Sequence, residues 1–272
     1  LVKCGFAEVA GFDTQPQGVI VAQNNTKKLV DEKIDSSQWL IFADNHGFGE
    51  ELARQLESNC ILVFRGINYQ QLDEFRYQVN PLVKNDFERL LESVRENAAV
   101  EKVVHLWSLD IPTISHMTDE QVRLSSQLGC ASVLHLVQSI NNNQSLWLVT
   151  QGVVNLGDDK AEGVIQSPLW GLGKVINLEH PGMGGFCIDL HPTIPIREQA
   201  SGLITEILSK SKEEQVAFRQ NQRFVPRLVR FQGKGLLAET KLQIPDNQPF
   251  QLGISKRGTL ENLELQPCIR RK

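Results

Sequence analysis

The chain has 272 residues, of which 41% are hydrophobic and 22% charged, and its formal net charge at pH 7 is -4. A length of this order allows one large domain or two small ones, and the apolar fraction is that of a globular protein with its own core. Charges of both signs are interspersed, and nothing in the charge pattern indicates nucleic-acid binding or an anionic membrane surface. No apolar run approaches the roughly 20 residues of a membrane-spanning helix.

From about residue 38 the apolar pattern alternates between short runs and helical spacing. Short apolar runs predict strands over 39–43, 61–64, 102–107, 145–150 and 185–189. Helical spacing predicts helices over 48–56, 83–94, from Thr118 to 137, from Ser167 to Pro181, and over 198–208. Residues 66–81 are polar and are expected to be irregular. Because the strands are continuously apolar and separated by helices, we expect an α/β fold with a parallel sheet covered by helices on both faces.

The two ends of the chain do not follow this alternation. Residues 1–37 contain one apolar strand, 19–22, among polar residues. Residues 215–218 and 224–229 predict a closing hairpin with Asn221 near its turn. After a Gly/Lys linker, 250–254 and 260–265 are strand-like, so the C-terminal tail is expected to be short and β-rich. The chain opens on Leu1 without the pattern of a signal peptide, and we expect it to be a piece of a longer polypeptide.

The cysteines and histidines indicate neither a disulfide framework nor a metal site. Five cysteines lie far apart and no pair has the C-x-x-C spacing, so buried free thiols in a reducing cytoplasm are expected. The six histidines show no ligand spacing with one another. Four acidic residues are expected to be solvated loop charges: Asp110, Asp158, Asp159 and Glu162.

The helix that starts after Ser167 has marked start and stop signals. Ser167 is a good N-cap residue, and Pro168 suits the first helical position. Gly171 and Gly173 weaken a helix, so we expect them to permit close approach of a neighbouring backbone. Pro181 ends the helix. Trp170 is interpreted as a core residue.

The loop after the first predicted strand has the position of a dinucleotide-binding glycine loop. A short-chain reductase would show Thr-Gly-x-x-x-Gly-x-Gly there. Gly47 and Gly49 match the last two glycines, but Ala43 stands in place of the first. Asp44 adds a negative charge where a pyrophosphate would lie. The sequence therefore predicts a degenerate loop with structural value and no bound cofactor.

The residues needed for ketone reduction are missing. Hydride transfer to a ketone needs a proton donor near the carbonyl oxygen, usually a Tyr whose pKa is lowered by a Lys four residues on. The only tyrosines, Tyr69 and Tyr77, precede the third predicted strand and have no such Lys. Trp170 does precede Lys174 by four residues, but an indole N–H is not a usable acid near neutral pH. Thr150 stands where a catalytic Ser is usual. We expect these residues to pack and not to catalyse.

These residues carry a family resemblance. The stretch Gln166-Ser-Pro-Leu-Trp-Gly-Leu-Gly-Lys-Val-Ile-Asn-Leu-Glu-His-Pro181, followed by Gly184-Gly-Phe-Cys-Ile-Asp-Leu190, resembles the non-catalytic structural subdomain of ketoreductases in modular type I polyketide synthases. The first strand from Trp39, its glycine turn and Phe224-Val-Pro-Arg-Leu228 are similar to it as well. The resemblance covers about residues 36–231. It implies a truncated Rossmann-like, short-chain dehydrogenase-like domain that binds no cofactor and packs against the catalytic ketoreductase half. Its structural residues would be Trp39, Ser167, Pro168, Trp170, Gly171, Gly173 and Pro181.

The tail adds a position within such a module. Residues 250–265 resemble the first strands of an enoylreductase, so the structural subdomain would stand before that domain. The implied organisation is an upstream linker or first strands (1–37), the structural subdomain (38–232), and a linker with the start of an enoylreductase-like region (233–272). The implied partners are the catalytic half, the enoylreductase, an upstream C-methyltransferase or dehydratase domain, and an acyl carrier protein bearing phosphopantetheine. NADPH would serve the partner reductase domains.

The leading hypothesis is therefore a pseudo-ketoreductase that stabilises the catalytic half and organises neighbouring domains during polyketide chain processing, without catalysis of its own. Two alternatives stay open at this point: an active NADPH-dependent reductase with unusual residues, and a domain-docking or dimerising module. No nucleic-acid, membrane or metal partner is expected.

Overall fold

The computed structural model consists of two compact units, residues 1–10 with 20–227 and residues 11–19 with 228–272. The structure describes residues 8–12, 19–23, 38–57, 60–97, 99–111, 118–141, 143–156, 162–209, 211–220, 222–228, 249–255 and 263–268.

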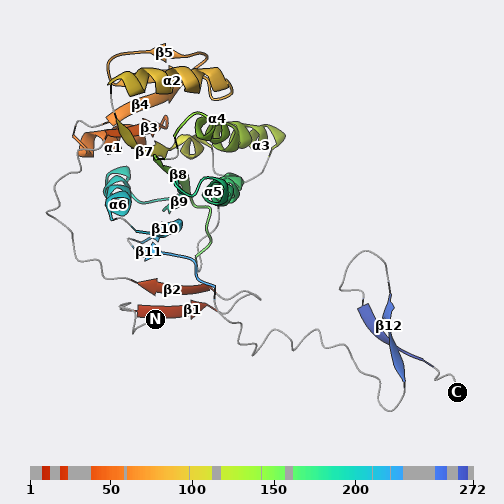
Figure 1. The fold of residues 1–272 in the computed structure, drawn as a ribbon. Helices are drawn as coiled ribbons and strands as arrows, with labels where there is room; N and C mark the ends of the chain where they lie inside the picture. Colours follow the sequence, from red (N-terminus) through yellow and green to blue (C-terminus); the bar gives the residue numbers. More distant parts are fainter. Residues whose placement is uncertain are drawn as a thin grey trace. The chain divides into compact units, whose positions relative to one another are not determined.

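A nine-stranded, mostly parallel sheet forms the centre of the larger unit (Figure 1), with strand order β11-β10-β9-β8-β7-β3-β4-β6-β5. Its strands are β3 (Gln38–Phe42), β4 (Cys60–Arg65), β5 (Gln70–Gln71), β6 (Arg76–Val79), β7 (Val100–His105), β8 (Ser145–Gln151), β9 (Gly185–Leu190), β10 (Gln215–Arg219) and β11 (Gln222–Phe224). All neighbours pair in parallel except β5 with β6 and β10 with β11. Among the seven parallel strands the order is third, second, first, fourth, fifth, sixth and seventh, which is the doubly wound order extended by β10, with its switch point between β3 and β7.

Helices cover both faces of this sheet, as the sequence predicts. One face packs against α2 (Lys84–Asn97), the segment from α3 (Asp119–Ser126) through the π-helical turn η3 (Gln127–Ala131) to α4 (Ser132–Val137), and α5 (Pro168–Glu179). The other face packs against α1 (Phe48–Gln55) and α6 (Ile196–Leu208). Alternate strand residues supply the two cores, so that Leu40 and Phe42 face one and Trp39 and Ile41 the other. This two-sided burial explains why the strands are continuously apolar.

The structure corrects the expectation for residues 66–81. They contain β5 and β6, and Tyr77 on β6 is buried in the core. The apolar pattern does not indicate this strand, because its solvated face carries polar residues such as Arg76. The connection from β4 to β6 contains no helix, although a parallel crossover usually carries one. The doubly wound sheet thus forms without a helix in this crossover.

Further boundaries differ from the sequence prediction. The second strand of the closing hairpin is Gln222–Phe224 and not 224–229. Trp107 is not part of β7 but begins the 3-10 turn η2 (Trp107–Asp110). The predicted helix from Thr118 is present, and Thr118 and Gln121 form the expected capping box, but η3 interrupts its regular hydrogen bonding.

The helix α5 begins at Pro168 and ends before Pro181, but Ser167 does not cap it. Ser167 already has helical backbone angles and its side chain makes no cap hydrogen bond, because the 3-10 turn η4 (Val164–Gln166) leads directly into the helix. A Cβ at Gly173 would lie 2.5 Å from Cys187 Sγ and 3.2 Å from Gly185 O, whereas at Gly171 it would meet nothing within 4 Å. The close approach therefore belongs to Gly173, and the expectation for Gly171 is not met.

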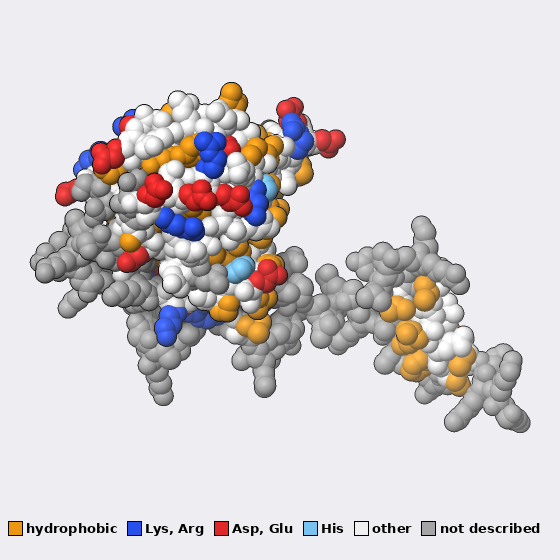
Figure 2. All heavy atoms as spheres, turned by 45° about the horizontal axis from the view of Figure 1, so that its top comes forward, with side chains coloured by type: hydrophobic (Ala, Val, Ile, Leu, Met, Phe, Trp, Pro, Cys, Tyr) orange, Lys and Arg blue, Asp and Glu red, His pale blue; other side chains and the backbone are white. Residues whose placement is uncertain are grey.

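Outside the large sheet, four strands form two small antiparallel sheets. In the first, β1 (Glu8–Phe12) pairs with β2 (Val19–Gln23); β1 was not expected from the sequence. The second is the C-terminal hairpin of β12 (Phe250–Ile254) and β13 (Leu263–Pro267). In its register Phe250 faces Pro267, and Leu252 faces Leu265, so one face is apolar. Figure 2 shows these hydrophobic side chains gathered on the hairpin. Asn221 and residues 260–262 of the predicted strand lie outside the described residues.

Candidate functional site

The candidate site lies at the carboxyl ends of the parallel strands, next to the switch point between β3 and β7. Ligands of doubly wound sheets bind in the crevice at this edge. The chain leaves β3 at Phe42, turns through Gly47, whose φ is +89°, and enters α1. A Cβ at Gly49 would lie 2.6 Å from the Cβ of Ala43, so this glycine allows α1 to pack directly on the end of β3.

The carboxylate of Asp44 takes the position at which a helix end attracts an anion. Its Oδ1 accepts the backbone N–H of Gly49 (2.8 Å), and its Oδ2 accepts those of His46 (2.9 Å) and Phe48 (3.2 Å). Asp44 is only 1% exposed. The first N–H groups of a helix are unpaired within the helix and carry its positive dipole end. In this structure a side chain of the chain itself satisfies them.

A second carboxylate, that of Asp110, lies at the same edge of the sheet, in the turn that follows β7. Asp110, in η2, accepts the backbone N–H of Asn45 at 2.7 Å and forms an ion pair with Arg65, Nη2 to Oδ2, at 2.7 Å. Its side chain is 3% exposed, so the expectation of a solvated loop charge is wrong: the turn after β7 folds the carboxylate under Arg65. Burial raises the pKa of the Asp110 carboxyl, against the lowering effects of the Asn45 N–H and Arg65, and Asp44 adds to the rise.

Glu162 is exposed, and Asp158 and Asp159 lie outside the described residues.

Thr150 and Trp170 stand where a reductase would carry its catalytic Ser and Tyr. Their side chains form a hydrogen bond with each other. The indole Nε1 of Trp170 donates to Thr150 Oγ1 at 2.9 Å, and that hydroxyl lies 2.8 Å from Asp189 Oδ1, to which it donates. Thr150 and Asp189 are fully buried. The hydroxyl that would contact a substrate thus bridges two neighbours.

Asp189 also anchors the loop that follows β8. Its carboxylate accepts the backbone N–H groups of Val153 (3.0 Å) and Val154 (2.9 Å) and pairs with Arg219 Nη2 at 2.5 Å. Arg219, on β10, donates in addition to the carbonyl of Val154 at 2.6 Å. A buried ion pair with this many hydrogen bonds is costly to break, since removing one partner strands the other charge. Asp189 and Arg219 were not expected from the sequence, because only the pairing of β9 with β10 brings them together.

The two tyrosines lie at the other end of the sheet. Tyr77 is on β6, which three strands (β4, β3 and β7) separate from β8, about 19 Å at the usual strand spacing. The hydroxyl of Tyr69 lies 2.9 Å from Ser93 Oγ on α2. Neither ring is near the Trp170–Lys174 pair of α5.

Among the described residues, no group of three or more His, Cys, Asp or Glu side chains is placed to hold a metal ion. None of the described helices has the length and apolar character needed to span a bilayer.

Comparison with known proteins defines the family. Residues 37–208 match the family model described as "Beta-ketoacyl synthase-like, N-terminal", and the chain belongs to this family, which also covers the structural subdomain of ketoreductases. The chain is 39% identical over 107 residues to polyketide synthase GfsA from Streptomyces halstedii, which covers 38% of this chain and 1% of that protein. It is 25% identical over 197 residues to a phenolphthiocerol/phthiocerol polyketide synthase polypeptide from Mycobacterium tuberculosis, covering 72% of this chain and 12% of that protein.

Solved structures show the same fold. A multidomain structure with adenylation, ketoreductase and pseudo Asub domains from a keto acid-selecting NRPS module superposes with a TM-score of 0.67 at 20% identity, covering 83% of this chain and 18% of that one. A C2-type ketoreductase from a modular polyketide synthase gives a TM-score of 0.54 at 26% identity, covering 72% of this chain and 41% of that one. The chain is thus a ketoreductase-like domain of the polyketide synthase kind, and it spans only a small part of its curated relatives.

Proposed function

We propose that this domain is a structural half of a polyketide synthase ketoreductase, which binds no dinucleotide and stabilises a catalytic partner. The observation that carries the proposal is the buried carboxylate of Asp44, which holds three backbone N–H groups at the start of α1. A dinucleotide phosphate would need those donors, and it would meet two carboxylates, Asp44 and Asp110, in the same crevice.

The arrangement around Trp170 supports the same proposal. A reductase needs a hydroxyl that is free to donate a proton to a substrate carbonyl. Here the Thr150 hydroxyl donates to Asp189 and accepts from Trp170, and the tyrosines lie beyond three strands. NADPH would then be used by the partner reductase domains, and the acyl chain would be carried on the phosphopantetheine of a carrier protein.

The outer face of α5 is the surface we assign to the catalytic partner. Gly171 and Lys174 are exposed there, Val175 is 44% exposed and Leu178 is 81% exposed. Val175 and Leu178 are three residues apart and lie on the same face of α5, and adjacent exposed apolar side chains of this kind are typical of a contact surface. Upstream and downstream neighbours of the same polypeptide, including an enoylreductase, complete the proposed arrangement.

Calorimetric titration of the chain with NADPH tests the cofactor part of the proposal. No saturable heat is expected up to about 1 mM NADPH, while a complete ketoreductase in the same buffer serves as the positive control. Saturable binding in the micromolar range would refute the proposal, and turnover of a model ketone by the chain alone would favour an active reductase instead.

Co-purification with a catalytic ketoreductase half tests the partner surface. Leu178→Asp is expected to abolish the complex because it places a charge in an apolar contact, whereas Leu72→Asp, at a leucine that is 46% exposed before β6, is the matched control. Light scattering should show a monomer for the chain alone. A stable homodimer that Leu178→Asp dissociates would instead indicate a dimerising module.

A further inference from the structure

A largely enclosed pocket of about 250 Å³ lies on the α5 face of the sheet, beyond the carboxyl ends of β7 and β8. Its walls come from the α3–η3 segment, from η2 and the residue after it, and from η4 with the first turn of α5. An apolar cavity of about 150 Å³ can hold benzene, so this pocket has room for a molecule of up to about ten non-hydrogen atoms.

Gly129, in η3, shows that protein atoms do not fill this space. The residue is buried and lines the pocket, yet a Cβ placed on it would meet nothing within 4 Å. Gly171 is open in the same sense, but it is exposed on α5 and borders solvent. Because protein interiors are close-packed, open space beside a buried glycine marks a cavity.

The described residues that line the pocket carry no charged side chain. Ser108 donates its hydroxyl proton to the carbonyl of Val149, and Ser125 donates its own to the carbonyl of Ile165 at 2.7 Å. Both hydroxyl protons therefore already have acceptors within the chain. The rest of the wall is mostly apolar and comes from Ile111, Val122, Ile165, Pro168 and Leu169.

Two further polar groups reach the lining, and both are neutral. Cys130 is half-buried, and burial raises the pKa of its thiol, which keeps it protonated at neutral pH. Ser126 is exposed and lies at the rim. A charged ligand would lose its hydration without gaining an ionic partner here, so the lining favours a neutral ligand.

Gln166 brings one hydrogen-bond donor to this lining. It is 3% exposed, and its Oε1 accepts the backbone N–H of Gln151 at 3.1 Å, which fixes the orientation of the amide. Its Nε2 has no acceptor among the described residues, and it is not completely enclosed by them, so a ligand can reach it. A buried N–H donor without an acceptor is costly, and the pocket is therefore expected to receive one.

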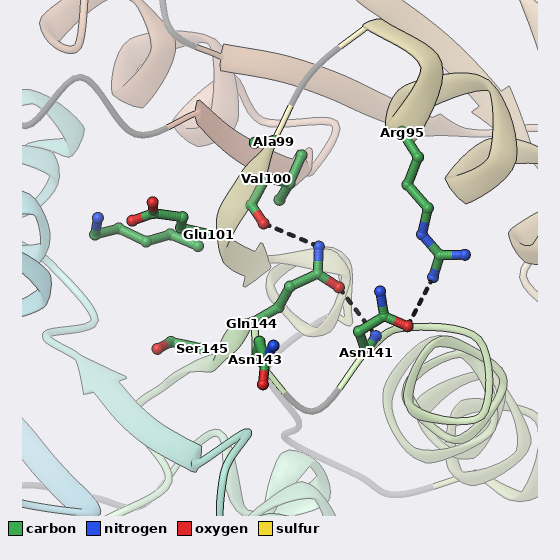
Figure 3. A pocket seen from close by; sticks show the side chains of 9 residues that line it. Arg95, Ala99, Val100, Glu101, Asn141, Asn143, Gln144 and Ser145 are labelled. Atoms are coloured by element: carbon green, nitrogen blue, oxygen red, sulfur yellow. Dashed lines mark hydrogen bonds between the residues drawn. The ribbon is translucent and has the colours of Figure 1, made fainter.

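A second pocket provides a comparison. The pocket in Figure 3, of about 440 Å³, lies at the amino ends of β7 and β8 and is lined by another buried glutamine, Gln144. There Gln144 Nε2 donates to Val100 O, its Oε1 accepts the N–H of Asn141, and Arg95 donates to Asn141 Oδ1. Figure 3 shows these side chains pointing toward one another. Both amide atoms of Gln144 are thus paired within the chain, whereas Gln166 keeps a donor for a ligand.

We propose that the pocket at Gln166 binds a small neutral carbonyl compound, such as a ketone, ester or amide with a short aliphatic part. The carbonyl oxygen accepts from Gln166 Nε2, and the aliphatic carbons contact Ile111, Ile165 and Leu169. Because the pocket is largely enclosed, a free molecule fits it better than the end of a long tethered chain. This proposal goes beyond the structural role proposed above, which rests on Asp44 and would stand if the pocket bound nothing.

Titration of the ¹⁵N-labelled chain with cyclohexanone, followed by NMR, tests the proposal. Saturable shifts are expected at the backbone N–H of Gly129 and at the side-chain NH₂ group of Gln166, with a Kd of about 1–10 mM for a ligand of so few atoms. Cyclohexanecarboxylate should give no saturable shift there, because its charge finds no partner. Saturable carboxylate shifts at these groups, cyclohexanone shifts scattered over the surface, or no saturation by about 50 mM cyclohexanone would each overturn the proposal.

Gln166→Glu isolates the proposed hydrogen bond. The new carboxylate can still accept the N–H of Gln151, but the donor is lost. Methylenecyclohexane carries a CH₂ group in place of the carbonyl oxygen, and measuring both ligands on both chains cancels the difference in their hydrophobicity. The Kd of cyclohexanone should rise about tenfold more than that of methylenecyclohexane. An equal change in the two values would show that Gln166 does not donate to the carbonyl.

Two further variants test the location of the site. Gly129→Leu fills the pocket and should abolish the cyclohexanone shifts, while Gly202→Leu, at an open glycine of α6 on the other face of the sheet, should leave them unchanged. Val122→Trp narrows the rim at a side chain that is 45% exposed, so it should weaken binding without altering the buried core. Unchanged cyclohexanone binding in Gly129→Leu or in Val122→Trp would contradict the assignment of the pocket.

Discussion

Replacing Asp44 with Ala tests whether its carboxylate stands in for a bound anion. The substitution leaves the backbone N–H groups of His46, Phe48 and Gly49 without their acceptor at a position that is 1% exposed. Loss of an N-cap side chain costs about 0.5–2 kcal/mol, and each hydrogen bond to a charged acceptor contributes about 1.5–3 kcal/mol. Because water can reach part of the emptied site, we expect a net loss of about 2–4 kcal/mol in the free energy of unfolding.

Urea unfolding followed by tryptophan fluorescence measures this loss, and pyrophosphate then supplies the second half of the test. An anion that replaces the carboxylate should stabilise Asp44→Ala by about 1.4 kcal/mol at a concentration ten times its Kd, and it should not stabilise the unsubstituted chain. Asp86→Ala is the matched control. Asp86 is also a buried aspartate, in the first turn of α2, but it accepts a single backbone N–H, that of Asn80 at 2.9 Å. This control should lose about 1 kcal/mol and gain nothing from pyrophosphate.

Two results would refute the reasoning. A loss below about 0.5 kcal/mol in Asp44→Ala would show that the three hydrogen bonds do not hold the start of α1. Equal stabilisation of both chains by pyrophosphate would show that the anion binds elsewhere and that Asp44 does not occupy its site.

Three further predictions concern the α5 helix and the core. Gly173→Ala should destabilise the fold by about 1–3 kcal/mol through the contact with Cys187, whereas Gly171→Ala should stabilise it by up to about 1 kcal/mol; chemical denaturation of the pair measures both. Burial lowers the pKa of His105 from 6.5 to about 3, so the stability that its neutral ring contributes is complete above pH 6.5 and is lost as the pH falls toward 3. At pH 4.5 the loss in the free energy of unfolding should be about 2–3 kcal/mol. His105→Phe should remove that part of the pH dependence. An unchanged dependence of the unfolding free energy on pH would contradict the assignment to His105. Trp170→Tyr places a Tyr four residues before Lys174, yet NADPH consumption with a ketone should stay at background, since the Asp44 carboxylate still accepts the backbone N–H groups that a phosphate would need.

The alternation of strands and helices could be predicted because each element carries its own local pattern. Both faces of β3 are buried, so residues 39–42 form one continuous apolar run. Thr118 and its complete capping box mark the start of α3. The prediction failed for β6, where polar residues on the solvated face hide a strand that buries Tyr77. It failed also at Ser167, because a preceding 3-10 turn continues into α5 and removes the need for a cap.

The candidate site was only partly predictable. Asp44 could be placed beside the glycine turn from its position alone, but its three hydrogen bonds depend on how the turn at Gly47 directs the chain. Asp110 looked like a solvated charge because its partner Arg65 is far from it in sequence and reaches it only from the end of β4.

By itself the sequence determined the doubly wound class of the fold, the departure of the first loop from the Thr-Gly-x-x-x-Gly-x-Gly pattern and the absence of a Tyr–Lys pair, because these follow from local periodicity and from residue identity. Tertiary structure alone decided which glycine of α5 contacts β9 and that Asp189 pairs with Arg219. Each of these depends on strand order and register, which bring together residues whose separation in the chain leaves no local pattern to read.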